Sequence, residues 1–253
     1  VALITGLANP FIVVYAKRIY ELPDNLVVLF LVVGNISAVS MGLLAHRLMD
    51  RLGAKSLYLI FLGILCLATM LIIGSPGLGR VGSLIFLGVL FFFYNFGLAG
   101  GMNSAQNYFY TITNVNERLN LGLLNYVLSG SAGALGSLVG GVLLRTLETT
   151  SLTSLNAFRI YYAVVLALLF GCFPLLTKLK NDGWFSVRTA LEIFLSRRNL
   201  RAVALLHKLD TSRTAGEEVK IIDSLAGSHS RVAVNDILNK LTEHLAPLVD
   251  REG

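Results

Sequence analysis

Residues 46–55, HRLMDRLGAK, separate two long stretches of the chain that carry no charged side chain, residues 25–45 and 56–79. A helix needs about twenty apolar residues to cross the hydrocarbon core of a membrane, and both stretches are long enough. The segment between them carries three basic side chains, one histidine and one carboxylate, all of which favour water. This contrast predicts two membrane-spanning helices joined by a tight polar turn.

The remainder of the chain repeats this pattern. Only 14% of its 253 residues are charged and 55% are hydrophobic, whereas roughly a quarter of the residues of a soluble domain are charged. Charge-free runs occupy residues 1–16, 25–45, 56–79, 81–116, 119–144 and 160–177. These runs predict an all-α, polytopic membrane bundle of six spans.

Two of the runs differ in length from a simple span. Residues 81–116 would measure roughly 54 Å as one helix, so we expect the end of that helix to leave the membrane. The first run is short and opens on Val1 rather than Met. We therefore expect the beginning of that helix to be missing from this sequence.

The charged residues divide the chain into two predicted domains, 1–178 and 179–253. Residues 178–253 hold twelve of the 21 Lys and Arg and ten of the 15 Asp and Glu. Apolar residues recur there at helical spacing, which predicts a small, soluble α-helical tail. Its short amphipathic helices are weakly similar to HEAT-type repeats. Two interpretations stay open: the tail binds a protein partner, or it is a plain folded appendage.

The distribution of Lys and Arg over short loops predicts how such a chain sits in its membrane. If odd-numbered spans run outward, the inner loops carry six basic residues, Arg47, Arg51, Lys55, Arg118, Lys178 and Lys180. The outer loops carry five, Lys17, Arg18, Arg80, Arg145 and Arg159. The bias is small, and the charged tail without an export signal decides the prediction. We expect an integral protein of the cell's inner or plasma membrane with a cytoplasmic tail.

The polar turn resembles the loop motif of the major facilitator superfamily of transporters. The matching residues are Asp50, Arg51, Gly53 and Lys55, while His46 stands where the motif has its first glycine. In that family the loop is a conformational latch that breaks when the transporter changes state. Physically, the Asp50 carboxylate can accept hydrogen bonds from free N–H groups at a helix start. The alternative is that the loop merely gathers basic residues, as short inner loops do.

A second resemblance begins at Asn116-Glu117-Arg118 and continues through the small residues of the segment 129–141. It is similar to the entry into the penultimate helix of the same family. Together the two likenesses cover residues 1–178 and imply the second six-helix half of a twelve-helix secondary transporter. The implied partners are the lipid bilayer, a small solute, and an N-terminal six-helix half in the same polypeptide or in a separate chain.

A transporter of this kind binds its solute near the middle of the membrane. Half a span is about ten residues, and counting this far from each predicted helix end reaches polar residues on the first, second, fourth and fifth spans. These cavity candidates are Asn9, Asn35, Tyr94, Asn95, Asn125 and Ser129. Each amide has an alternative role, because a buried asparagine often only hydrogen-bonds a neighbouring helix.

Two further groups have roles other than solute binding. Asn103, Gln106, Asn107 and Tyr110 share one helical face and lie near the predicted cytoplasmic mouth, which favours an interfacial or gate role. On the fifth span, small residues let a partner helix approach closely, and Gly136 and Gly140 form a GxxxG pair. The predicted packing residues are Gly133, Gly136 and Gly140.

The sequence leaves two functions from different classes open: a secondary transporter, and a non-transporting membrane scaffold or sensor whose tail binds a protein. We expect no enzyme, because no catalytic set of side chains is recognisable, and no cofactor. Cys66 and Cys172 lie in apolar runs without metal-ligand spacing, so we expect no metal site. The net charge of +6 comes with interleaved acids, which argues against a nucleic-acid partner.

Overall fold

The computed structural model describes residues 1–75, 77, 79–150 and 153–179, with the backbone alone for residues 45–52. This part of the chain forms six α-helices and holds no β-strand. They are α1 (Ala2–Ile19), α2 (Asp24–Leu52), α3 (Ala54–Ile73), α4 (Arg80–Ile112), α5 (Arg118–Thr149) and α6 (Ser154–Thr177). The all-helical prediction is confirmed over these residues. The tail prediction falls on residues 180–253, outside the described part.

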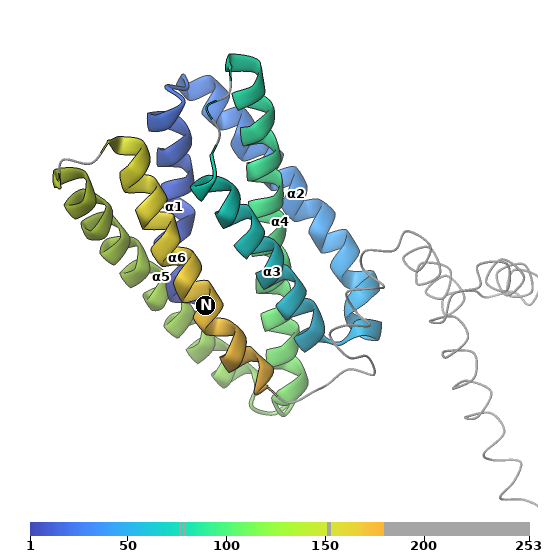
Figure 1. The fold of residues 1–253 in the computed structure, drawn as a ribbon. Coiled ribbons are helices and arrows are strands. Elements are labelled where there is room, and N and C mark those ends of the chain that lie inside the picture. The colour runs from blue at the N-terminus through green and yellow to red at the C-terminus, as the bar shows by residue number, and fades with distance from the viewer. Residues whose placement is uncertain (76, 78, 151–152, 180–253) are drawn as a thin grey trace, which may run out of the picture. The chain divides into compact units, whose positions relative to one another are not determined.

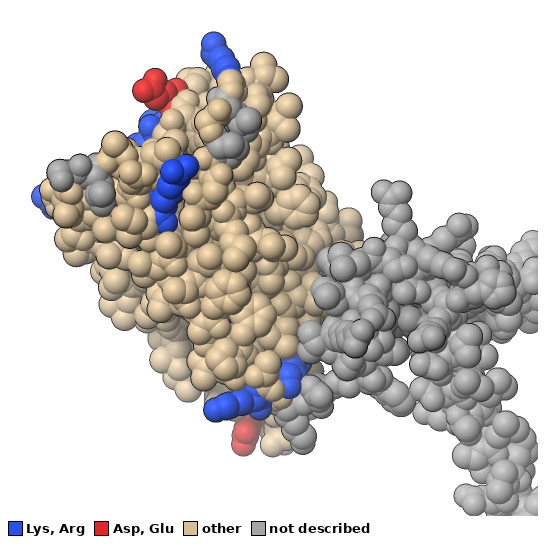
Figure 2. All heavy atoms as spheres, in the orientation of Figure 1, with Lys and Arg blue, Asp and Glu red and all other residues tan. Residues whose placement is uncertain are grey.

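The six helices run alternately up and down, so each connection joins two helices at one end of the bundle (Figure 1). All six are long and apolar enough to cross a membrane. On the face seen in Figure 2, the Lys, Arg, Asp and Glu side chains lie at the two ends, with an uncharged band between them. A bilayer requires such a band, and the chain is a multi-pass membrane protein. We call its two ends the Arg18 end, where α1 finishes, and the Lys55 end, where α3 begins.

The turn between α2 and α3 is shorter than the sequence predicts. Helix α2 continues through residues 46–52, and the single residue Gly53 separates it from α3. Gly53 has a φ of 80°, which glycine adopts at little cost and other residues avoid. The helix extends this far because residues 46–52 include neither proline nor glycine, the residues that end helices most effectively.

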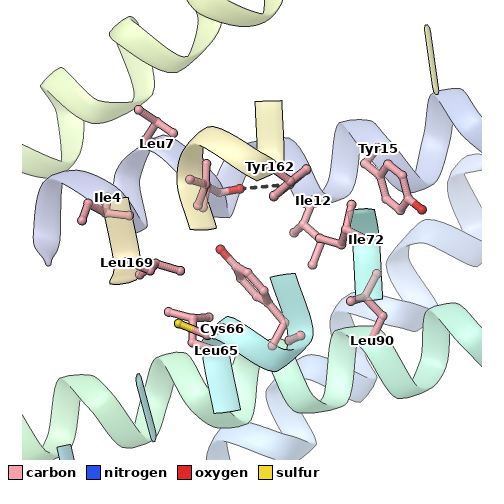
Figure 3. Close-up of a cluster of buried hydrophobic side chains, with 14 of the residues drawn as sticks. Ile4, Leu7, Ile12, Tyr15, Leu65, Cys66, Ile72, Leu90, Tyr162 and Leu169 are labelled. Carbon is pink, nitrogen blue, oxygen red and sulfur yellow. Dashed lines mark hydrogen bonds between the residues drawn. The ribbon is translucent and has the colours of Figure 1, made fainter. Parts of the chain in front are cut away.

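Helix α3 is the most buried of the six helices and packs against α4 and α6. Helix α1 packs against α5 and α6, and α2 packs against α4. The shared core contains aliphatic side chains of α1 together with Leu65 and Cys66 of α3 and with Tyr162 and Leu169 of α6 (Figure 3). Helix α5 contributes little to this core, since only 17% of its span is buried. Most of the surface of α5 is therefore exposed, and part of it lines the cavity described below.

Two arginines cap the ends of neighbouring helices. The Arg118 guanidinium, at the start of α5, donates to Tyr110 O at 3.1 Å in the last turn of α4. The Arg159 guanidinium of α6 donates to Ser75 O at 3.0 Å, just beyond the end of α3. Carbonyl groups at a helix C-terminus lack intrahelical donors and carry partial negative charge, so a cation stabilises them. These arginines therefore have a local role at both ends of the bundle.

Candidate functional site

A cavity of about 800 Å³ lies among α1, α3, α4 and α5. Its polar lining consists of three amides, three hydroxyl side chains and three tyrosines: Asn9, Gln106, Asn125, Thr5, Ser129, Ser137, Tyr58, Tyr110 and Tyr126. Glycines form much of the remaining wall: Gly6, Gly97, Gly101, Gly122, Gly130 and Gly133. Among the described residues that line it, none is Asp, Glu, Lys, Arg or His. The described wall of the cavity is therefore largely apolar, with scattered uncharged polar groups and no charged side chain.

Three of the six predicted cavity residues line this space, namely Asn9, Asn125 and Ser129. All three are exposed in the isolated chain, so the cavity opens to its surface. Within the described residues, neither the Asn9 amide nor the Asn125 amide has a hydrogen-bond partner. Both amides are thus available to a solute or to another polypeptide.

The other three lie elsewhere. Tyr94 is fully buried in the core, where its hydroxyl has no hydrogen-bond partner among the described residues. The Asn95 amide donates to Phe91 O at 2.9 Å on its own helix and faces Gly34, where an added Cβ would come within 2.5 Å of it. Asn35 is exposed on α2, outside the cavity lining. Asn95 therefore serves the packing of α2 against α4.

The predicted packing glycines lie where α5 crosses α1. A Cβ on Gly136 would overlap Leu3 O and would lie 2.9 Å from Leu7 N. A Cβ on Gly140 would lie 3.1 Å from Leu7 O. Gly133 has open space at its own Cβ position, but its carbonyl oxygen occupies the space that a side chain on Gly6 would need. The two backbones are thus close enough that only glycine fits at three of these positions.

The same face of α5 has two roles along its length. From Gly133 toward the Arg18 end it packs on α1, and toward the Lys55 end it turns Gly122, Asn125 and Ser129 to the cavity. At the far end of the helix, Glu148 pairs with Arg18 of α1. Helix α5 is therefore attached to α1 along one half, while its other half forms a cavity wall.

A single glutamine bridges the cavity near the Lys55 end. The Gln106 amide of α4 donates to the Tyr126 hydroxyl of α5 at 3.0 Å and to the Tyr110 hydroxyl at 3.2 Å. The sequence places Gln106 and Tyr110 in a gate at the cytoplasmic mouth. The structure places both on the cavity wall as well, and Gln106 links α4 to α5 through the Tyr126 hydroxyl.

Sequence reasoning missed the wall formed by α3 and α4. Tyr58 lines the cavity but stands only a few residues inside α3, so counting half a span from the helix end does not reach it. Gly97 lets α4 approach α3, since a Cβ there would lie 2.9 Å from Leu65 N. The signal that could have found this wall is the glycine cluster at residues 97–101, which has the small-residue spacing of a packing face.

The four predicted latch residues lie on both sides of the α2–α3 junction. Asp50 and Arg51 belong to the last turn of α2, and their side chains lie outside the described part. Gly53 supplies the turn. The Lys55 ammonium group donates to Thr177 O at 2.8 Å and also to Leu179 O, so it caps the C-terminus of α6.

Replacement of Lys55 by methionine should therefore loosen α6. We expect a loss of about 1–2 kcal/mol in unfolding free energy, because two hydrogen bonds from a charged donor disappear at a partly exposed site. Thermal unfolding of the purified protein measures this loss. Lys178→Met is the matched control, since Lys178 is exposed and has no partner among the described residues. Equal melting temperatures for the two variants would contradict the capping role.

Comparison with known proteins finds no family model that matches the chain, and no curated protein or solved structure with significant similarity.

Proposed function

We propose that this chain forms half of a secondary transporter of the major facilitator type, working by alternating access on an uncharged polar solute. The observation that carries the proposal is the cavity of about 800 Å³, whose wall includes amides and hydroxyls although it is formed by helices apolar enough to span a membrane. Ligand sites of membrane transporters lie in such places, because polar groups there are costly unless they serve a function. The resemblance of residues 47–55 to the family's loop motif supports the same conclusion.

The exposure of the cavity supports the proposal of a partner half. Asn9, Asn125 and Ser129 are exposed in this chain although they lie within membrane-spanning helices. Polar side chains within membrane spans almost always face a protein interior or water rather than lipid. A second six-helix half, in the same polypeptide or in a separate chain, would cover this face and enclose the cavity.

The lining sets the class of solute. Each amide both donates and accepts hydrogen bonds, as do the hydroxyls of Ser129 and Tyr126, and this suits a solute rich in hydroxyl or amide groups. A charged solute would need a compensating charge in so apolar an environment, and the described lining offers none. The site therefore fits a neutral, hydrogen-bonding compound.

The alternative is a membrane scaffold whose cytoplasmic tail binds a protein partner. His46 in place of the motif's first glycine favours it. In this case the cavity would be a remnant of a transporter, and Asn9 and Asn125 would bind no solute.

Uptake by proteoliposomes distinguishes the two functions. The natural, full-length protein is reconstituted and given three pairs of radiolabelled compounds that differ in charge: glucose and gluconate, uridine and uridine monophosphate, glycerol and glycerol phosphate. We expect saturable uptake of at least one neutral member and none of its charged counterpart. Saturable uptake of charged members alone would contradict the uncharged site. Uptake no faster than that of empty liposomes for all six compounds would favour the scaffold.

A further inference from the structure

Helix α1 contains Pro10, and the consequence is a free carbonyl one turn earlier. Proline has no N–H group, so Gly6 O lacks the donor that would complete its helical hydrogen bond. The Ser137 hydroxyl of α5 lies 3.0 Å from Gly6 O and 3.1 Å from Gly133 O. Gly133 O can already accept from the backbone of its own helix, whereas Gly6 O has lost the N–H group that residue 10 would otherwise supply. The hydroxyl thus supplies the bond that Pro10 removes, as hydroxyl side chains do in membrane helices.

The next two carbonyls of α1 are also held, this time by α6. The Tyr161 hydroxyl donates to Leu7 O, and the Tyr162 hydroxyl donates to Ala8 O at 3.3 Å. Both tyrosines are fully buried. Three consecutive carbonyls of α1 therefore accept side-chain hydrogen bonds from two other helices. We call these three donors, Ser137, Tyr161 and Tyr162, the carbonyl clamp.

The clamp depends on close packing around it. A Cβ on Gly140 would come within 2.5 Å of the Tyr161 hydroxyl, so glycine at this position leaves room for the bond to Leu7 O. A proline in a helix bends it and removes one constraint on its direction. The clamp restores that constraint from outside the helix, at the three residues that come directly before Asn9.

We propose that the carbonyl clamp is a set of positioning residues that aims the Asn9 amide into the cavity. Asn9 and Pro10 follow the clamped carbonyls and both line the cavity, and the Asn9 amide has no partner among the described residues. The binding of a solute by Asn9 rests on the proposed function, whereas the orientation of the Asn9 amide does not. Tyr161 and Tyr162 are not among the residues that line the cavity, so they act through the backbone of α1.

Thiol labelling tests the clamp without any solute. In a background of Cys66→Ala and Cys172→Ala, Asn9→Cys and Asn125→Cys are prepared separately in the full-length protein and reconstituted. A membrane-impermeant sulfonated maleimide is the probe. With Tyr161→Phe and Tyr162→Phe added together, we expect labelling at position 9 to slow by about threefold or more. Labelling at position 125 should keep its rate, since α5 does not carry the two tyrosines.

Controls separate positioning from general loosening. Tyr15→Phe removes a buried hydroxyl that pairs with Tyr20 instead of an α1 carbonyl, and it should leave both labelling rates unchanged. If the double variant does not fold, Tyr162→Phe alone removes one clamp bond from outside the cavity lining and should slow labelling at position 9 alone. An unchanged or faster rate at position 9, or equal slowing at both positions, would overturn the proposal. If labelling at position 9 slows as expected but the uptake panel shows no transport, the clamp proposal stands and the transport proposal is overturned.

Discussion

Replacement of Gly136 by alanine is expected to destabilise the bundle, while the same replacement at Gly130 of the same helix is not. A methyl group at position 136 would overlap Leu3 O, so α1 and α5 must separate. Overpacking of this kind costs about 1–3 kcal/mol. At position 130 nothing lies within 4 Å of the added methyl group, and alanine stabilises a helix by about 1 kcal/mol relative to glycine.

Thermal unfolding of the two variants in the same lipid or detergent measures the difference. The two changes add the same atoms to the same helix and differ only in what the methyl group meets. The melting temperature should fall for Gly136→Ala and stay equal or rise for Gly130→Ala. Equal shifts in melting temperature would mean that α5 does not pack on α1 through this face. The cavity wall formed by α5 would then also be misplaced.

Replacement of Asn125 by leucine should weaken solute binding by about tenfold or more. Leucine has nearly the shape of asparagine but no hydrogen-bonding groups, and a polar group of the bound solute left without its partner costs about 1–3 kcal/mol. Asn35→Leu is the matched control, because Asn35 is also exposed on a membrane-spanning helix but lies outside the cavity lining. The measurement is the half-saturation concentration for whichever neutral compound of the uptake panel is transported.

The Asn35→Leu control shows whether an effect on the half-saturation concentration is specific to the cavity. We expect Asn35→Leu to leave the half-saturation concentration unchanged and Asn125→Leu to raise it. Loss of affinity in both variants would place α2 at the solute site and extend the cavity beyond the described lining. No change in either would show that Asn125 does not contact the solute.

The number and approximate position of the helices could be predicted from the sequence because apolar runs of membrane length have few alternatives in a lipid environment. Each of the six charge-free runs corresponds to one helix of the structure. Their ends could not be predicted by charge alone. Helix α2 passes through residues 46–52 because charged side chains are compatible with a helix, and only Gly53 ends it.

The site could be predicted in part. Depth along a helix follows from residue number, but the direction of a side chain around the helix axis depends on which neighbours pack where. Ser129 and Asn95 have the same predicted depth, and packing of Asn95 against Gly34 decides that it faces α2. Tyr58 lines the cavity because α3 and α4 lie close together, and Gly97 of α4 permits this close approach.

The orientation in the membrane was weakly determined by sequence for a related reason. The rule that basic residues favour the inner side treats every Lys and Arg alike. Here Arg159 is engaged by the end of α3 and Lys55 by the end of α6, so each serves its neighbour helix. Basic residues that cap helices occur at both ends of the bundle and reduce the contrast that the rule requires.

The most direct test of the central claim, that polar residues of α5 face a solute cavity and not lipid, is the labelling of two cysteines one turn apart on α5. Asn125→Cys lies in the cavity wall, whereas Leu128→Cys replaces a residue that is 60% exposed outside the cavity lining. Both are made in the cysteine-free, full-length protein and exposed in proteoliposomes to a membrane-impermeant maleimide. We predict that position 125 reacts and position 128, facing lipid, does not. No reaction at position 125, or equal reaction at both, would contradict the account.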